Sequence, residues 1–302
     1  MTPRDLLVLG DWGTSRLRLV LFDGDQRLDD VQGPGIGALT TSPLETLAEA
    51  LVPWRKRFAL DRVVMCGMAG SRNGVVEAPY APCPADALDW ARLAAGTAVE
   101  GIEVVVAPGV AGERPNGAPD VMRGEEAQIF GAMALDRALA IGEHRLILPG
   151  THSKWCLVRD GRIVRFQTFL TGELFALLQA RSTLLLGATY ADGSDSEEGF
   201  AAGLARAHDA PLLGALFETR SAQLRANRGG DWATAFLSGL IIGAEIAEAV
   251  AAFDPESVTL IGADELTLRY LPALQARSLP ATVMSGEDCA LAGLRLFDAT
   301  RP

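Results

Sequence analysis

The sequence predicts an α/β fold built from two related domains. Three observations favour it: strand-like and helix-like segments alternate along the chain, one glycine-containing hairpin pattern occurs twice, and 302 residues suit about two domains. A hydrophobic content of 49% with 22% charged residues supplies large cores and argues against wholesale disorder. We place the domains at residues 1–143 and 144–302 and expect the last helix to pack back toward the first domain.

The repeated hairpin pattern covers residues 6–24 and residues 146–161. In each copy an apolar strand, a glycine turn, a second strand and an Asp-Gly turn follow one another. A single offset of 137 residues maps both turns of the first copy onto those of the second: Gly13-Thr14 onto Gly150-Thr151, and Asp23-Gly24 onto Asp160-Gly161. The shared offset favours a duplicated architecture over two chance matches.

Hydrophobic periodicity predicts the remaining elements in order. Strands are expected at residues 62–65, 104–107 and 258–261. Helices are expected at residues 43–58, 125–140, 174–180, 197–207, 232–253, 265–275 and 287–297. The segment 107–120 is rich in Gly and Pro, which predicts a loop that could serve as a lid or a connection.

Charge and composition exclude several classes of function. The 27 basic and 38 acidic residues give a net charge of -11, and without a Lys/Arg block nucleic acid is not an expected partner. Glu245 and Glu248 interrupt the apolar helix 232–253, which argues against a membrane span. The 4 cysteines show neither paired nor metal-site spacing, and residues 1–5 form no signal peptide. A cytoplasmic location is therefore expected, and the oligomeric state has no signature in the sequence.

The first glycine turn, Gly-Asp-Trp-Gly-Thr-Ser at residues 10–15, has the residues of an anion site. Gly13 lets backbone N–H groups approach an anion, and the hydroxyls of Thr14 and Ser15 add donors. Asp11, at the end of the strand, could hold Mg²⁺ or its water shell. The spacing matches neither a dinucleotide-binding fingerprint nor a Walker A loop. A plain hairpin turn remains the alternative.

The second glycine turn, at residues 149–155, reads Pro-Gly-Thr-His-Ser-Lys-Trp. Gly150 and Thr151 could form an anion nest, and Lys154 adds a positive charge beside it. His152 is either structural or a further donor to a phosphate. Two such loops facing each other across a cleft would bind the phosphates of ATP from both sides.

Several acidic residues lie at predicted helix starts. Glu125 and Glu126 open one helix and Glu173 opens another, where the helix dipole alone favours a carboxylate. A carboxylate at such a position is also what phosphoryl transfer needs to accept the proton of an attacking hydroxyl. Both interpretations stay open for these residues.

Two loops that follow predicted strands complete the candidates. In the loop 65–72, Gly70 and Ser71 allow close backbone approach, and Arg72 could pair with a carboxylate. Gly262 lies between a strand and a helix and could accept an adenine. A loop with a solvated Arg is the alternative for the first of these.

Taken together, these motifs resemble the 2-dehydro-3-deoxygalactonokinase family. Pro-Gly-Thr-His followed by Lys-Trp is specific to that family, whereas Asp-x-Gly-Thr is shared with other sugar kinases, heat-shock chaperone ATPases and actin. The resemblance runs from about residue 6 to about residue 297 and is carried by residues 11–15, 65–71, 123–126, 149–155, 169–174 and 236–245.

The resemblance implies an actin-like ATPase fold, with two ribonuclease-H-like domains around a central cleft. It implies ATP-dependent phosphorylation of the 6-hydroxyl of 2-dehydro-3-deoxy-D-galactonate, with ATP and Mg²⁺ as cofactors and a small-molecule sugar acid as partner. The phosphate loops it implies are Gly13, Thr14 and Ser15 in the first domain and Gly150, Thr151, His152 and Lys154 in the second, with Gly262 at the adenosine site.

The resemblance also implies the groups that act on the substrate. By analogy with related exopolyphosphatases the base is Glu126 or else Glu125, and because the second loop lacks the acid often found there, metal binding falls to Asp11. The substrate-binding candidates are Arg16, Gly70, Ser71, Arg72, Arg123 and Glu173. A kinase for another small sugar or sugar acid, or an actin-like ATPase that activates a partner protein, are the alternatives.

Overall fold

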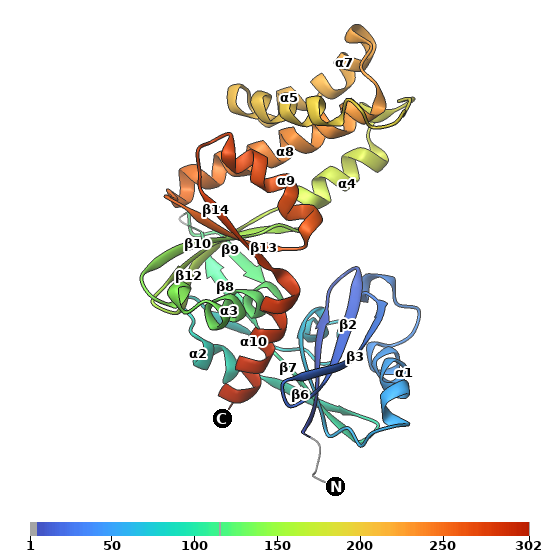
Figure 1. Cartoon of the computed structure of the whole chain (residues 1–302), viewed down its shortest axis with the longest axis vertical. Coiled ribbons are helices and arrows are strands. Elements are labelled where there is room, and N and C mark those ends of the chain that lie inside the picture. The colour runs from blue at the N-terminus through green and yellow to red at the C-terminus, as the bar shows by residue number, and fades with distance from the viewer. Residues whose placement is uncertain (1–4, 115, 302) are drawn as a thin grey trace. The chain divides into compact units, whose positions relative to one another are not determined.

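The computed structural model describes residues 5–114 and 116–301 and forms two compact units (Figure 1). The first comprises Met1–His144, Cys156–Gln167 and Met284–Pro302, and the second comprises Arg145–Trp155 and Thr168–Val283. Strands and helices alternate along the chain, which is the α/β pattern that the sequence predicts.

A mixed sheet of six strands lies in the first unit. Its order is β3 (Gln26–Pro34), β2 (Arg16–Asp23), β1 (Leu6–Trp12), β4 (Arg62–Gly67), β7 (Ile102–Val106) and β6 (Ala95–Val99). β1 pairs antiparallel with β2 and parallel with β4, and β4 pairs parallel with β7. Successive residues of β4 are buried, so both faces of the sheet are covered at this strand.

A second sheet repeats this arrangement. Its order is β12 (Arg162–Phe169), β11 (Ser153–Arg159), β10 (Glu143–Leu148), β13 (Val258–Gly262) and β14 (Ala281–Ser285). In both sheets three consecutive strands lie in reverse order, and the first of them borders a later strand in parallel, β1 with β4 and β10 with β13. The duplication that the offset of 137 residues predicts is therefore confirmed as a repeated sheet topology.

The predicted loop at residues 107–120 is wrong in part, because two short strands lie in or across it. β8 (Gly109–Glu113) pairs parallel with β5 (Tyr80–Pro82) and antiparallel with β9 (Pro119–Met122). These strands form through backbone hydrogen bonds to one another, and their side chains do not alternate between apolar and polar. Its Gly and Pro content hides that pairing from a hydrophobic pattern.

The helices follow the predicted order, and additional short ones occur. They are α1 (Pro43–Arg55), α2 (Ala87–Ala91), α3 (Glu125–Leu135), α4 (Thr171–Arg181), α5 (Ser196–Asp209), α6 (Leu212–Leu216), α7 (Glu218–Ala226), α8 (Gly230–Phe253), α9 (Asp264–Gln275) and α10 (Gly286–Thr300). Single 3-10 turns occur at Ile36–Ala38, Met68–Gly70, Arg137–Ala140 and Thr183–Leu185.

The helix predicted at residues 125–140 ends earlier, at Leu135. Asp136 has an extended backbone, and its side chain accepts a hydrogen bond from the N–H of Ala138 at 3.0 Å. An aspartate in this position caps the following 3-10 turn, so the α-helix is not continued.

Helix α1 begins where the sequence supplies a capping box. The Ser42 hydroxyl accepts from the N–H of Glu45 at 3.2 Å, and the Glu45 carboxylate accepts from the N–H of Ser42 at 3.0 Å. Pro43 occupies the first helical position, where no N–H is needed. The helix then buries Leu47 and Trp54 in the core of the first unit.

Helix α8 is long and apolar enough, by length and composition, to cross a membrane. It has 24 residues and a hydropathy of 1.7, but 67% of its apolar window is buried inside the structure. Figure 1 shows α5 lying alongside it, and Trp232 and Phe236 stack with ring centroids 4.9 Å apart within an apolar cluster. We therefore interpret α8 as a core helix.

Helices α3 and α10 contact each other through their backbones (Figure 1). A Cβ added to Gly131 would lie 1.7 Å from the carbonyl oxygen of Cys289, and one added to Gly293 would lie 1.9 Å from that of Ala127. Such distances leave no room for a side chain at either glycine. The contact holds the start of α3, where the candidate acids lie, against the C-terminal helix.

Replacing Gly131 by Ala should lower the free energy of unfolding by about 1–3 kcal/mol, because the new methyl group must push the two helices apart. The matched control is Gly214→Ala in α6, where an added Cβ meets nothing within 4 Å; this change should leave stability unchanged or raise it slightly. Denaturant unfolding measures both. Equal losses for the two variants would contradict the contact.

Candidate active site

Asp11 lies near the end of β1, opposite Cys66 of the parallel strand β4. The Cys66 thiol donates to Oδ1 of Asp11 at a sulfur–oxygen distance of 3.7 Å. Burial raises the pKa of Asp11 above its usual value, and it also raises the pKa of the Cys66 thiol, which stays protonated. A thiol is a weak donor, so this carboxylate would be stabilised further by a cation.

The donor set around Asp11 suits Mg²⁺ that arrives on a nucleotide better than a metal enclosed by protein. Among residues 5–114 and 116–301, no three His, Cys, Asp or Glu side chains gather closely enough to hold a metal ion. Mg²⁺ commonly keeps several waters and binds one or two carboxylates together with substrate phosphates. A single carboxylate is therefore sufficient for this kind of site.

In the turn after β1 the amide of Gly13 is already used inside the turn. The N–H of Gly13 donates to the carbonyl of Arg16 at 2.8 Å, which closes the turn. The carbonyl of Thr14 accepts from the N–H of Gly37 at 3.0 Å. Thr14 and Ser15 are exposed. An anion here would meet the hydroxyls of Thr14 and Ser15, whereas the N–H of Gly13 is engaged with Arg16.

The two acids at the start of α3 have different environments. Glu126 is fully buried, and both of its carboxylate oxygens lie 2.8 Å from the N–H of Gly124. Burial, followed by the charge of Glu125, raises the pKa of Glu126 to about 8. Glu125 is only partly buried and accepts from the N–H of Arg123 at 3.1 Å. Glu126 is thus a carboxyl group that changes its charge close to neutral pH.

The substrate-binding candidates of the first unit fall into two groups. Arg16 is exposed, and the side chain of Arg72 is 86% exposed with its Nε 3.8 Å from a Glu77 oxygen. In the second group, Ser71 directly follows the turn Met68–Gly70. The guanidinium of Arg123 lies 4.2 Å from the ring centroid of Tyr80. A Cβ on Gly70 would lie 2.6 Å from Nη1 of Arg123, so the structure brings Gly70 and Arg123 together.

In the second glycine turn the middle residues are exposed and the following ones are buried. Thr151 and His152 are exposed, whereas Lys154 is buried and donates to the carbonyl of His152 at 2.9 Å. Nε2 of His152 is paired with a carboxylate oxygen of Glu173, and the N–H of Glu173 donates to the carbonyl of Thr151 at 2.9 Å. In the second unit, Glu173 therefore lies beside the glycine turn.

Glu245, in the middle of α8, binds the buried end of this turn, at Ser153 and Trp155. It has no role in the site expected from the sequence. Oε1 accepts from the hydroxyl of Ser153 at 2.8 Å and from the indole of Trp155 at 2.9 Å. Oε2 accepts from the hydroxyls of Tyr270, at 2.6 Å, and Thr171. Burial raises the pKa of Glu245, while these four donors act in the opposite direction. An acid inside an apolar helix is the sequence signal that could have revealed it.

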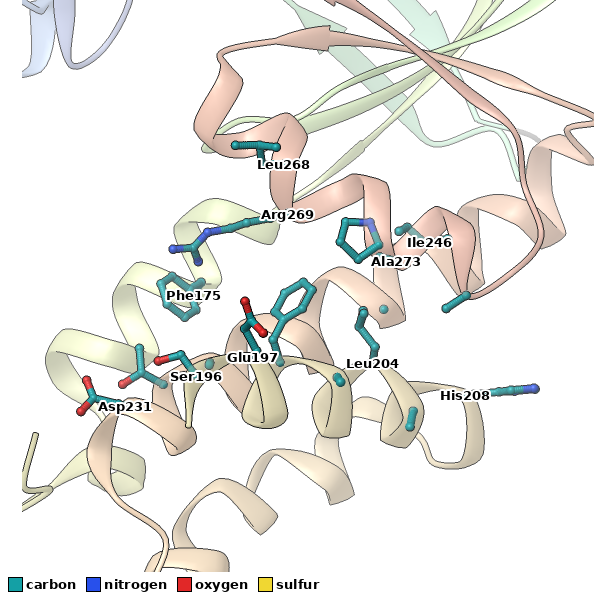
Figure 2. A pocket seen from close by; sticks show the side chains of 18 of the residues that line it. Phe175, Ser196, Glu197, Leu204, His208, Asp231, Ile246, Leu268, Arg269 and Ala273 are labelled. Carbon is teal, nitrogen blue, oxygen red and sulfur yellow. The ribbon is translucent and has the colours of Figure 1, made fainter. Parts of the chain in front are cut away.

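A cavity of about 1170 Å³ lies in the second unit between α4, α5, α8 and α9 (Figure 2). Phe175, Leu204 and Leu268 contribute apolar walls, and Glu197 and Arg269 contribute charges. A smaller cavity of about 70 Å³ shares Phe175 and Arg269 with it and is also lined by Gly150. The two cavities therefore share part of their lining, and the smaller one reaches the glycine turn at Gly150.

Gly262 lines neither cavity but lies close to the second glycine turn. It ends β13, and a Cβ built on it would be 3.6 Å from Cδ of Pro149, the residue before the turn. Helix α9 begins two residues later and supplies Leu266 to the smaller cavity and Leu268 to the larger one. The strand end at Gly262 therefore lies next to the glycine turn and to the helix that lines both cavities.

The raised pKa of Glu126 makes stability depend on pH. A carboxyl group that keeps its proton more tightly when folded stabilises the fold below its ordinary pKa, and this stabilisation is lost as the pH rises toward about 8. Between about pH 6 and pH 9 we expect the wild type to lose about 2–3 kcal/mol more unfolding free energy than Glu126→Gln. Urea unfolding at both pH values measures this, and parallel losses would contradict the burial of the acid.

Sequence comparison places this chain in a known family. The family model for 2-keto-3-deoxy-galactonokinase matches residues 11–297. The 2-dehydro-3-deoxygalactonokinase of Escherichia coli (strain K12) is 35% identical over 301 residues, which are 98% of this chain and 97% of that one. The Rhizobium meliloti (strain 1021) protein named probable 2-dehydro-3-deoxygalactonokinase DgoK1 is 34% identical over 304 residues and 97% of each chain.

Solved structures agree with this assignment. A crystal structure from Sinorhizobium meliloti, described as a 2-dehydro-3-deoxygalactonokinase protein, matches with a TM-score of 0.85 and 32% identity over 96% of this chain and 97% of that one. Component A of (R)-2-hydroxyglutaryl-CoA dehydratase from Acidaminococcus fermentans matches with a TM-score of 0.55 and 13% identity over 98% of each chain, which shows a shared fold alone. The expected actin-like ATPase fold is confirmed. The chain belongs to the 2-keto-3-deoxy-galactonokinase family.

Proposed function

We propose that this protein transfers the γ-phosphoryl group of ATP to the 6-hydroxyl of 2-dehydro-3-deoxy-D-galactonate, giving 2-dehydro-3-deoxy-6-phosphogalactonate and ADP. Identity of 34–35% over nearly the whole chain to relatives named for this activity carries the proposal. The carboxyl groups of the first unit support it, because phosphoryl transfer to an alcohol needs an acceptor for the hydroxyl proton. The enzyme is thus a phosphotransferase of carbohydrate metabolism, and we propose that it acts in the cytoplasm.

In the first unit we assign Glu126 as the general base and Glu125 as the alternative. A pKa of about 8 lies close to the working pH, where a base both accepts a proton readily and is present in its charged form. Asp11 would hold Mg²⁺ on the nucleotide, and Thr14 and Ser15 would donate to phosphate oxygens. Bound Mg²⁺ supplies charge neutralisation of the transferring phosphoryl group.

In the second unit we assign the remaining nucleotide contacts. Gly150, Thr151, His152 and Lys154 would bind phosphates. The large cavity, which shares Phe175 and Arg269 with the smaller cavity at Gly150, would hold the adenosine, and Gly262 would lie beside it. We also retain as proposals the domain boundary near residue 143, the packing of the last helix toward the first domain, and substrate contacts from Arg16, Gly70, Ser71, Arg72, Arg123 or Glu173.

An assay of ADP release tests the reaction. With ATP and Mg²⁺, kcat/KM for 2-dehydro-3-deoxy-D-galactonate should exceed that for D-glucose and D-galactose by at least about 100-fold, because a site built for a carboxylate leaves buried donors unpaired with a neutral sugar. The epimeric 2-dehydro-3-deoxy-D-gluconate tests how finely the acid is selected. Turnover with neutral hexoses alone would contradict the proposal.

The role of Glu126 predicts a pH profile. In the wild type kcat/KM should rise with pH up to about 8, as Glu126 loses its proton. Glu126→Gln should lower kcat by about 100-fold or more and abolish this rise, while ATP binding persists. Glu77→Gln, at a side chain that is 64% exposed, is the matched control. Near-normal turnover of Glu126→Gln would move the role to Glu125, to be tested by Glu125→Gln.

A further inference from the structure

Three arginines of the first unit are candidates for the substrate carboxylate, and their surroundings separate them. Arg16 and Arg72 are exposed, so water already solvates their charges and an added carboxylate would gain little. Arg123 is different, because its guanidinium nitrogens Nε and Nη1 are buried. Only a buried cation gains the full strength of an anionic partner.

The guanidinium of Arg123 is held in place by its own contacts. Nη2 donates to the carbonyl of Ala78 at 2.8 Å and reaches the carbonyl of Pro79 at 3.5 Å. The group lies over the ring of Tyr80, 4.2 Å from its centroid. One side of the guanidinium is thus fixed by backbone oxygens and an aromatic ring, which orients the side chain without neutralising its charge.

The other donors of Arg123 have no acceptor in the part of the chain that the structure describes. Nε and Nη1 are buried without a hydrogen-bond partner, and so is Oγ of Ser71. Nη1 lies against Gly70, where a Cβ would approach it to 2.6 Å. Buried polar groups normally have partners, and leaving a charged donor unpaired costs folding free energy. The three groups together are suited to an anionic oxygen acceptor.

We propose that Arg123 and Ser71 bind the C1 carboxylate of the sugar acid, with Gly70, which has no Cβ, allowing the guanidinium to lie against the loop. This inference rests on the proposed function and deepens it, because it assigns the group that separates 2-keto sugar acids from neutral sugars. The side chain of any residue other than glycine at position 70 would crowd Nη1. A sugar with a hydroxymethyl group in place of the carboxylate would leave the cation without a counter-ion.

The position of this site relative to the proposed base fits the substrate. The charge of Arg123 acts on Glu126, although more weakly than burial does, so the two groups lie within electrostatic range. Within the described residues, the hydrogen bonds of the Arg123 guanidinium go to the backbone carbonyls of Ala78 and Pro79. The carboxylate and the 6-hydroxyl are opposite ends of the substrate chain, so separate but neighbouring groups are required for binding and for proton transfer.

Steady-state kinetics and calorimetry test the assignment. Arg123→Ala should raise KM for 2-dehydro-3-deoxy-D-galactonate by about 10- to 100-fold and Ser71→Ala by about 3- to 10-fold, the range for hydrogen bonds to a charged group. KM for ATP should change by less than about threefold in both. Arg57→Ala, at another exposed arginine of the first unit, is the control and should change neither constant. Ser71→Ala and Arg123→Lys keep the test decisive if Arg123→Ala folds poorly.

The outcomes separate this inference from the proposed function. If the wild type does not phosphorylate the sugar acid, the function is wrong, and calorimetry with pyruvate as the 2-keto carboxylate probe then tests the site alone. Pyruvate binding by the wild type that is lost in Arg123→Ala supports the site. Wild-type KM for the sugar acid in folded Arg123 and Ser71 variants, an equal rise in KM for ATP, or pyruvate binding that survives Arg123→Ala would overturn it.

Discussion

The buried carboxylate of Glu245 is the interaction on which the second unit depends most. Its two oxygens accept four hydrogen bonds, from Ser153 and Trp155 in the last part of the glycine turn, from Thr171 at the start of α4 and from Tyr270 in α9. A carboxylate inside an apolar helix is costly unless it is fully hydrogen-bonded, so the four segments must keep their relative positions. The geometry of the turn is therefore fixed from its buried side, whereas Thr151 and His152 on its other side are exposed.

A second constraint is the net charge, because both ATP and a sugar acid are anions. With a net charge of -11, attraction cannot come from the overall field. It must come from a few oriented donors and cations that are removed from water, where each interaction is stronger. Arg123, fixed over Tyr80 with buried unpaired donors, is such a group in the first unit. We propose buried Lys154, in the second glycine turn, as a further cation of this kind.

Sequence patterns predicted what depends on neighbouring residues and missed what depends on distant ones. The hairpins, the strand β4 and the helix α8 were predictable because periodicity and turn residues are local. The strands β8 and β9 were not, because their order comes from pairing with each other and with Tyr80–Pro82. The donors of Glu245 lie 25 to 92 residues away from it in the sequence. The choice of Arg123 over Arg72 required the structure, which shows that donors of Arg123 are buried and that Arg72 is exposed.

Binding of ATP to Glu245→Gln, measured by calorimetry, tests this account most directly. The amide keeps the shape of the side chain but cannot accept four hydrogen bonds, so the turn should lose its fixed geometry. We expect a folded variant that binds ATP at least about tenfold more weakly, with a smaller loss in Tyr270→Phe and none in the exposed control Glu256→Gln. Wild-type affinity for ATP in folded Glu245→Gln would contradict the account.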